Sequence, residues 1–167
     1  MSVIDHRSQA PASVRCAVVT VSDTRTDATD TSGRTIADLL GAAGHAVVHR
    51  ALVPDDRVRL SALLEELLAR EDVDVVLTTG GTGISARDGT YEAVSALLEK
   101  RLDGFGELFR MLSYTDVGPA AMLSRACAGL ARGRIVVALP GSEAAVRLAM
   151  QRLLLPELGH LVREARR

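Results

Sequence analysis

The feature that most constrains the fold is an alternation of short apolar runs with helical segments. Two runs, Arg15–Val21 and residues 73–77, are rich in valine and other apolar residues, as expected for strands buried on both faces of a sheet. Between them, positions 60, 63, 64, 67 and 68 are all leucine, which is the spacing of a helix packed on a core. This order predicts an α/β protein: three layers, with helices on both faces of a mostly parallel, doubly wound sheet.

The other elements follow the same order. Further strands are predicted at Ala46–Val53 and Arg134–Leu139. Helices are predicted at 33–43, capped by Thr31 or Ser32, near 90–99, across 104–125 with an interruption at Gly118-Pro119, and from Ser142 with a bend at Pro156. The chain has 167 residues, enough to bury roughly 69% of its surface in one domain. Residues 1–14 are polar and aperiodic, so we expect a flexible tail before a single domain at 15–167.

Composition excludes several classes of protein. Lys and Arg total 20 against 21 Asp and Glu, which argues against binding nucleic acid or an anionic membrane by charge. No apolar run reaches the roughly 18 residues of a membrane span, and the N-terminus has no signal-peptide core. Cys16 and Cys127 form neither a metal-ligand spacing nor a disulfide framework. We therefore expect a cytoplasmic protein without nucleic acid or membrane partners.

Polar residues follow the predicted strands at their carboxyl ends, where ligands bind in open parallel sheets. Ser22 and Asp23 follow the first strand, Asp55 follows the second, and Pro140, Gly141 and Ser142 follow the last. The loop at 22–32 is long for a strand-to-helix connection and is a functional candidate. If the topology is parallel, these residues meet at one edge of the sheet.

The segment after the third strand reads TTGGTG. Gly80, Gly81 and Gly83 let backbone amides approach a ligand, and Thr79 and Thr82 add hydroxyl groups, so this loop is predicted to bind phosphate. The alternative is a tight turn that needs glycine for its geometry alone.

Neither familiar nucleotide motif is complete. Residues 81–86 fit G-x-G-x-x-A, but the acidic partner about 20 residues on would be Asp103, in a segment, 100–104, where no strand is expected to end. No Gly-Lys-Ser/Thr follows the glycines either, so the Walker pattern fails.

Carboxylates near this loop point to a cation. Asp88 would repel a bound phosphate unless Mg²⁺ intervened, and Asp55 could supply a second carboxylate to that ion. Helix capping is the alternative role for Asp55 or Asp56, for Asp88, and for Ser142. Ser142 could instead form a second anion site with the free helix amides.

Other polar residues leave their roles open. Arg110 and Arg125 could pair with acidic neighbours or meet a phosphate. The four histidines form no pair with helical ligand spacing, and His45 and His49 are expected at the start of the second strand and within it.

Several ordered motifs carry a resemblance to a known family. TTGGTG followed by Arg87-Asp88, GFGE at 104–107, LSR at 123–125 and LPGS at 139–142 resemble the molybdopterin adenylyltransferase family, which is MogA/MoaB-like. The match spans roughly residues 14–160, and residues 104–113 look closer to the MoaB branch.

This resemblance implies transfer of AMP from Mg-ATP to molybdopterin, giving adenylyl-molybdopterin and pyrophosphate. It implies that Asp55 and Asp88 are catalytic and metal-linked, and that the loop at 80–83 holds the nucleotide. It places Ser22, Asp23, Glu107 and the turn at 140–142 on the pterin and phosphate side. It also implies a homo-oligomer, a trimer or hexamer, and contact with other molybdenum cofactor biosynthesis proteins.

Two other functions remain open at this point. Some MoaB-like proteins are thought not to be active enzymes, so one alternative is a non-catalytic molybdopterin-binding or scaffold protein. A nicotinamide-binding domain is the second alternative, and the missing acidic residue at a second strand end counts against it.

Overall fold

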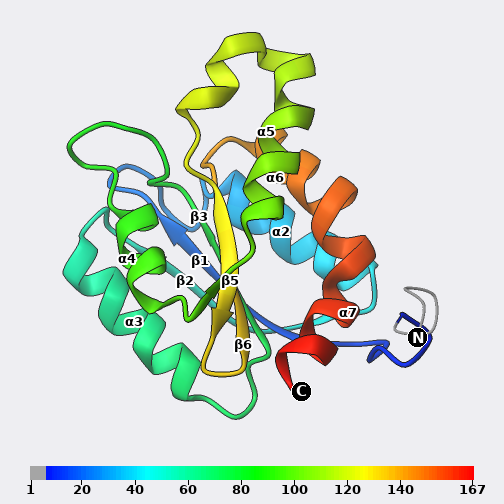
Figure 1. The fold of residues 1–167 in the computed structure, drawn as a ribbon. Helices are drawn as coiled ribbons and strands as arrows, with labels where there is room; N and C mark the ends of the chain where they lie inside the picture. The colour runs from blue at the N-terminus through cyan, green and yellow to red at the C-terminus, as the bar shows by residue number, and fades with distance from the viewer. Residues whose placement is uncertain (1–6) are drawn as a thin grey trace.

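The computed structural model describes residues 7–167, which fold around one six-stranded sheet with strand order β2-β1-β3-β6-β5-β4 (Figure 1). The strands are β1 (Arg15–Val21), β2 (Ala46–Val53), β3 (Val75–Thr79), β4 (Lys100–Arg101), β5 (Cys127–Ala131) and β6 (Arg134–Leu139). The helices are α2 (Thr31–Ala42), α3 (Arg57–Ala69), α4 (Thr90–Leu97), α5 (Asp103–Val117), the 3₁₀ segment η1 (Gly118–Leu123), α6 (Glu143–Ala149), the π-helical turn η2 (Met150–Leu154) and α7 (Leu155–Ala165). Strands β2, β1, β3 and β6 are parallel, and β5 and β4 add antiparallel pairings at one edge.

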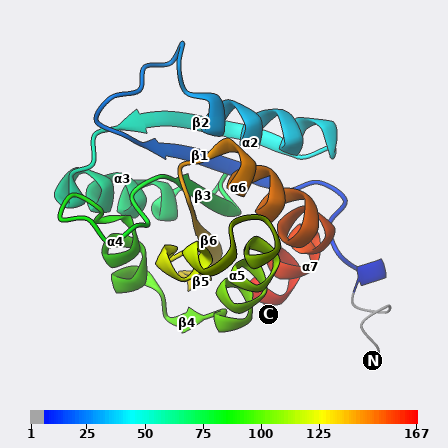
Figure 2. The same cartoon turned by 90° about the horizontal axis from the view of Figure 1, so that it is seen from above.

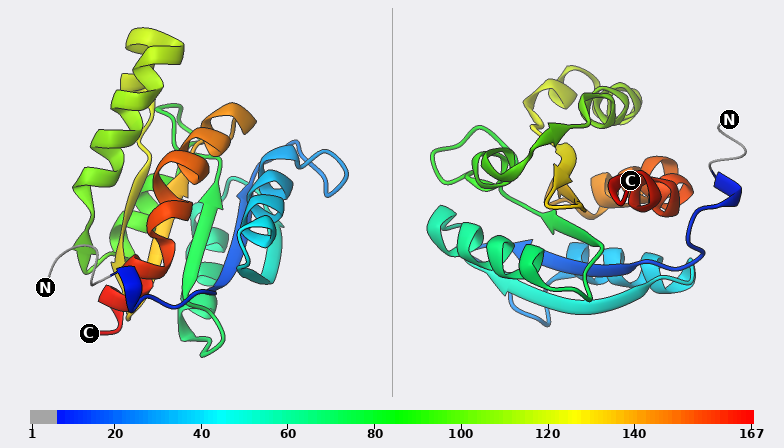
Figure 3. Two further views of the ribbon diagram at one scale, coloured as in Figure 1. Left: turned by 90° about the vertical axis from the view of Figure 1, so that its right-hand side faces the viewer. Right: turned by 60° about the horizontal axis from the view of Figure 1, so that its bottom comes forward.

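Helices cover both faces of the sheet, which confirms the predicted three-layer class (Figures 2 and 3). Successive side chains of a strand point to opposite faces, so Val18 and Leu77 join a core with α2, α5, α6 and α7. Val19 and Val76 face the other way, into a core with the leucines of α3 and residues of α4. The continuous apolar runs in the sequence are therefore explained by burial on two sides.

The strand predictions are largely confirmed, with two corrections. The bounds of β1, β2 and β6 agree with the prediction, whereas the third strand runs over Val75–Thr79 instead of 73–77. Strands β4 and β5 were not predicted. Since Lys100–Arg101 is itself a strand, the expectation that no strand lies at 100–104 is wrong; it is a two-residue antiparallel strand at the far edge of the sheet from β2.

Side-chain caps set the starts of α2 and α3. Asp30, not Thr31 or Ser32, caps α2 by accepting a hydrogen bond from the Gly33 amide at 2.9 Å, so this helix begins two residues earlier than predicted. Asp56 caps α3, as one of the alternatives proposed, by accepting from the Arg59 amide at 2.9 Å.

The last helical segment is interrupted just before the predicted bend at Pro156. Proline lacks an N–H and its ring crowds the carbonyl four residues earlier, at Arg152. The helix widens over the preceding turn, Met150–Leu154, where the Leu155 amide donates to the Met150 carbonyl.

The N-terminal prediction is partly corrected. Residues 1–6 lie outside the described residues. Val14 is fully buried, Arg7 pairs with Glu157, and the Arg163 guanidinium donates to Gln9 at 2.7 Å. The packed domain therefore begins before residue 15, with residues 7–14 held against α7.

Two further properties follow from the fold. Cys16 and Cys127 are free and buried. In the described part of the chain, no helix is long and apolar enough to cross a membrane.

Candidate active site

The sheet topology brings the predicted site segments to one edge. From β1 the chain crosses to β2 on one side, and β3 then returns to pair with β1 on its other side. Such a reversal of strand order leaves a crevice at the carboxyl ends of the strands, where ligands bind in this class of sheet. Because β6 runs parallel to β3, the turn at 140–142 reaches the same edge.

The glycine-rich turn is dictated by close backbone packing. Gly80 and Gly81 have φ of +100° and +70°, a region that favours glycine. A Cβ at Gly80 would lie 2.2 Å from the carbonyl oxygen of Val21, and one at Gly81 would lie 2.3 Å from the hydroxyl of Thr90. Both glycines are thus required for geometry, as the tight-turn alternative states.

The two threonines predicted to contribute hydroxyl groups, Thr79 and Thr82, are buried. Thr79 is fully buried, and its hydroxyl donates to the Pro140 carbonyl at 2.7 Å. Thr82 is buried, and its carbonyl accepts the amide of Arg125 at 2.9 Å. These contacts hold the loop after β3 against the end of β6 and against the segment that precedes β5.

A carboxylate at the end of β1 links two other loops. One oxygen of Asp23 accepts hydrogen bonds from the Arg87 guanidinium at 2.7 and 3.1 Å, and the other accepts the Asp55 amide at 2.9 Å. The Arg87 guanidinium lowers the pKa of Asp23. Asp23 is therefore ionised and engaged on both oxygens.

Asp55 and Asp88 line the same cavity, of about 660 Å³. Burial raises the pKa of Asp55, the charges of Asp88 and Asp23 raise it further, and the Gly89 amide and Arg87 oppose this shift. Two carboxylates thus interact unfavourably at the mouth of the crevice.

The Asp88 carboxylate stabilises its own loop. It accepts the amide of Ser85 at 2.8 Å, and a Cβ at Gly83 would lie 2.7 Å from it. The N-cap of α4 is Gly89, without a side-chain cap. The alternative role of Asp88 as a helix cap is therefore wrong.

Three arginines line this cavity, and they differ in their hydrogen-bond and ion-pair partners. Arg87 is paired with Asp23. Arg125 is paired with Glu92 and also donates to the Gly83 carbonyl at 2.9 Å, so it fixes the loop. Within the described residues, no carboxylate forms an ion pair with Arg57, which is exposed at the start of α3.

A metal ion in this cavity would need ligands from water or a bound phosphate in addition to those from the protein. Among residues 7–167, no three His, Cys, Asp or Glu side chains are grouped to hold a metal ion. Asp55 and Asp88 fit Mg²⁺, which binds through one or two carboxylates and takes its remaining ligands from phosphate and water.

The turn at 140–142 borders a second, mostly apolar cavity of about 280 Å³. Pro140 and Ser142 line it, together with residues of α5, η1 and α6. The Ser142 hydroxyl caps α6 by accepting the Ala145 amide at 3.2 Å, the alternative role given above. Gly141 packs against Gly80, so the two turns lie side by side.

Of the predicted site residues, Asp55, Asp88, Pro140 and Ser142 line these two cavities. The others do not: Ser22, Asp23, Thr79, Glu107, Gly141 and the loop at 80–83. The Ser22 hydroxyl accepts the amides of Thr24 and Arg25 at 3.2 and 3.1 Å and shapes the loop after β1. Glu107 is exposed on α5 and lines neither cavity. Arg110 is also elsewhere, donating to the carbonyls of Ser124 and Ala126.

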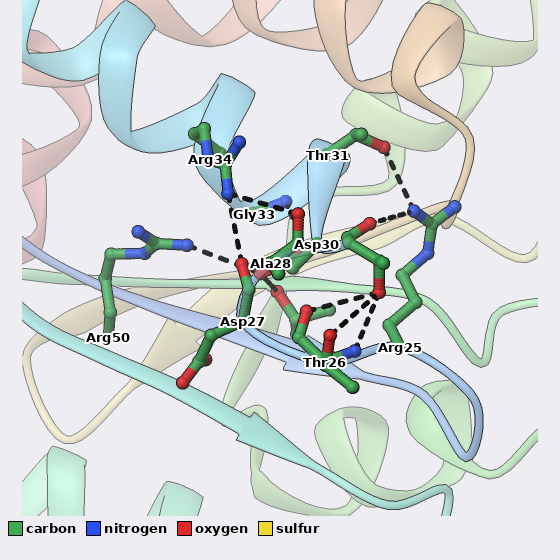
Figure 4. Close-up of polar contacts among 11 residues, drawn as sticks. Arg25, Thr26, Asp27, Ala28, Asp30, Thr31, Gly33, Arg34 and Arg50 are labelled. Carbon is green, nitrogen blue, oxygen red and sulfur yellow. Dashed lines mark hydrogen bonds and ion pairs between the residues drawn. The ribbon is translucent and has the colours of Figure 1, made fainter.

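The long loop after β1 is internally bonded (Figure 4). Arg25 donates to the Thr29 carbonyl at 2.7 Å and to the Thr31 hydroxyl at 3.0 Å. Asp30 is buried and accepts from Thr20 at 2.8 Å and from Arg50 at 3.4 Å. This network gives the segment that carries Asp23 a defined conformation.

Several residues of the first cavity were not identified from sequence: Arg57, Val58, Ile84, Ser85 and Glu92. The sequence does indicate one of them: Val58 is aliphatic, yet it lies off the helix face that the leucines at 60, 63, 64, 67 and 68 form.

Comparison with known proteins identifies the family of this chain. Residues 17–160 match the family described as "Probable molybdopterin binding domain". Molybdenum cofactor biosynthesis protein B of Bacillus anthracis is 55% identical over 168 residues, covering 100% of this chain and 99% of the relative. A crystal structure of a molybdenum cofactor biosynthesis protein B superposes with a TM-score of 0.90 at 55% identity, covering 94% of this chain and 98% of the other. The tungsten cofactor synthesizing protein MoaB from Pyrococcus furiosus gives 0.85 at 38% identity, covering 95% and 100%. The chain therefore belongs to the MoaB/MogA family of molybdenum cofactor biosynthesis proteins.

Proposed function

We propose that this protein transfers AMP from ATP to the terminal phosphate of molybdopterin, releasing pyrophosphate. One observation carries the proposal: Asp55 and Asp88 come from different loops and line one cavity at the carboxyl edge of the sheet, beside three arginines. Membership of a family with a probable molybdopterin-binding domain supports molybdopterin as the acceptor.

The reaction asks the chain for positioning and charge compensation. A phosphate oxygen of molybdopterin attacks the α-phosphorus of ATP, and the bond from that phosphorus to the bridging oxygen of the β-phosphate breaks. Pyrophosphate leaves with the electron pair of that bond. Such transfers need reactants held in line and negative charge neutralised.

In this proposal, Asp55 and Asp88 hold Mg²⁺, which would neutralise the phosphate oxygens when bound. Burial is the main cause of the raised pKa of Asp55, and the negative charges of Asp88 and Asp23 add to it. A cation between Asp55 and Asp88 would relieve the added repulsion, which supports this assignment. Asp23 acts as a positioning residue, since it holds the Asp55 amide and the Arg87 guanidinium.

The phosphates of ATP would meet Arg57. Arg87 and Arg125 are each paired with a carboxylate, whereas Arg57 pairs with none in the described part of the chain. Thr79, Thr82 and the glycines at 80–83 serve this site by holding the loop in place. We assign the pterin side to the turn at 140–142, which lies beside that loop.

We also propose a homo-oligomer. Of the eight large apolar side chains that are exposed in residues 7–167, six lie on α5 and η1: Leu108, Met111, Tyr114, Val117, Met122 and Leu123. A patch of this kind marks an interaction surface, and the trimer or hexamer expected from the resemblance would cover it. Light scattering of the purified protein should give a mass of three or six chains.

The activity is tested by incubating the protein with molybdopterin, ATP and Mg²⁺ and measuring adenylylated pterin and pyrophosphate. We expect equal amounts of both products, and none after EDTA is added. Molybdopterin binding without any product would contradict the proposal and favour the non-catalytic alternative.

A further inference from the structure

Two exposed aliphatic side chains stand apart from the patch on α5 and η1. Val58 and Ile84 have 79% and 71% of their surface exposed, and both line the cavity that holds Asp55 and Asp88. They are the remaining two of the eight exposed large apolar residues in the described chain. Because both side chains line one cavity, they differ from single apolar residues that are scattered over a protein surface.

Neither side chain is required by the core. Val58 is the second residue of α3, which packs on the sheet through Leu60, Leu64 and residues beyond. Ile84 lies on the loop between Gly83 and Ser85, whose backbone is fixed by hydrogen bonds to Arg125 and Asp88. Two well-anchored elements thus each present one aliphatic group to the same space.

We propose that Val58 and Ile84 form an apolar subsite for the adenine ring of ATP, which deepens the function proposed above and rests on it. A purine has apolar faces and a polar edge, so aliphatic side chains can bury the faces while water meets the edge. Among residues 7–167, no aromatic side chain lines this cavity, so the site offers a flat ring aliphatic contact.

The order of residues fits a single nucleotide. Asp55, Arg57 and Val58 follow one another across the end of β2 and the first turn of α3. A base on Val58 therefore leaves its phosphates within the part of the cavity that holds Arg57 and the two carboxylates. On the facing loop, Ile84 and Asp88 repeat this arrangement of an apolar and an acidic group.

Calorimetric titration separates the base from the phosphates. The probes are Mg-ATP and Mg-tripolyphosphate, which shares the phosphate chain and lacks the nucleoside. For the double variant Val58→Ser/Ile84→Ser we expect about tenfold weaker binding of Mg-ATP, with binding of tripolyphosphate unchanged. Val58→Ile/Ile84→Leu should keep the wild-type affinity for ATP. Ala62→Ser, which changes an exposed apolar residue of the same helix as Val58 outside the cavity, is the matched control.

The other outcomes would overturn the inference. An equal loss for both probes would show that the substitutions disturb the phosphate site instead of a base subsite. Unchanged ATP binding with weaker molybdopterin binding would assign the pair to the pterin. If the wild-type protein bound no Mg-ATP, the proposed function itself would fail, and the subsite with it.

Discussion

Asp23 and Arg87, 64 residues apart in sequence, are joined by two hydrogen bonds of 2.7 and 3.1 Å. The second oxygen of the same carboxylate accepts the Asp55 amide. One side chain at the end of β1 therefore sets the positions of a carboxylate after β2 and a guanidinium after β3. Arg87 is therefore engaged by Asp23 and is not an unpaired cation in the cavity.

Substitution of Asp23 should affect activity more than stability. In Asp23→Ala, Arg87 loses its partner and Asp55 loses the acceptor of its amide, so the reacting groups are less well positioned. We expect kcat/KM to fall by about 10²-fold, while the melting temperature changes little because the pair is exposed. Steady-state kinetics and thermal unfolding test this together. An unchanged kcat/KM would show that the link is incidental.

Asp55→Asn should stabilise the fold while it removes activity. The raised pKa of Asp55 means that the folded state disfavours its ionised form. At neutral pH the charge therefore costs stability. This cost fades as the pH falls through the raised folded-state pKa, and it is absent below the unfolded value.

Thermal unfolding at pH 7 and at pH 4 checks the sign. We expect a higher melting temperature for Asp55→Asn than for the wild type at pH 7, and a smaller difference at pH 4. Added Mg²⁺ should raise the melting temperature of the wild type and not of the variant. A lower melting temperature for Asp55→Asn at pH 7 would contradict this reading of the site.

Arg57 is predicted to bind the phosphates of ATP. Arg57→Gln should weaken both Mg-ATP and Mg-tripolyphosphate by about tenfold, because a charge-assisted contact is lost. Arg59→Gln is the matched control, since Arg59 lies on the same helical turn but does not line the cavity. Equal effects of the two variants would indicate only a change in overall charge.

At the opposite edge of the sheet, Asp74 ties the two ends of the domain together. It accepts hydrogen bonds from the side chains of Arg15, at 2.9 Å, and Arg166, at 2.7 Å. Burial alone would raise the pKa of Asp74, but the bonds from Arg15 and Arg166 outweigh it and hold that pKa well below its usual range.

A depressed folded-state pKa stabilises the protein above the unfolded value near 4, and this contribution is lost as the pH falls further. Asp74→Asn should lower the melting temperature by about 5 °C at pH 7, with the difference shrinking below pH 4. A difference that stayed constant down to pH 2 would show that ionisation of Asp74 does not contribute.

The sequence predicted the sheet well where the strands are buried on both faces. Arg15–Val21 and Arg134–Leu139 are mostly apolar runs too short for a packed helix, so the sequence predicts their bounds directly. Asp55 and Asp88 were brought together correctly because parallel strands place their carboxyl ends at one edge.

The hairpin of β5 and β6 was missed for a physical reason. Strand β5 consists mainly of small residues, CAGLA, and its turn is Arg132-Gly133 with φ of 50° and 73°. Turns with two positive φ values usually carry asparagine or glycine at the first position. Arginine at this position does not predict a turn from the local sequence. The pairing of β5 with β6 determines the conformation of the turn.

The apolar part of the cavity could not be read from the pattern. Periodicity identifies residues that are buried, whereas Val58 and Ile84 matter because they stay exposed. Likewise, Arg87 has a carboxylate partner and Arg57 has none among the described residues, and this difference depends on loop positions that spacing does not specify. The ion pair of Arg87 with Asp23 joins residues 64 positions apart, which no local pattern indicates.

The central claim is that Asp55 and Asp88 form one Mg²⁺-dependent centre for adenylyl transfer. Its most direct test is the rate of adenylyl-molybdopterin formation, measured against Mg²⁺ concentration for the wild type, Asp55→Asn, Asp88→Asn and the double variant. Asp38→Asn, an exposed acid on α2, is the control. We predict a loss of about 10³-fold in each single variant, no further loss in the double variant, and an unchanged control. Full activity in either single variant, or product formed by the wild type in EDTA, would contradict the claim.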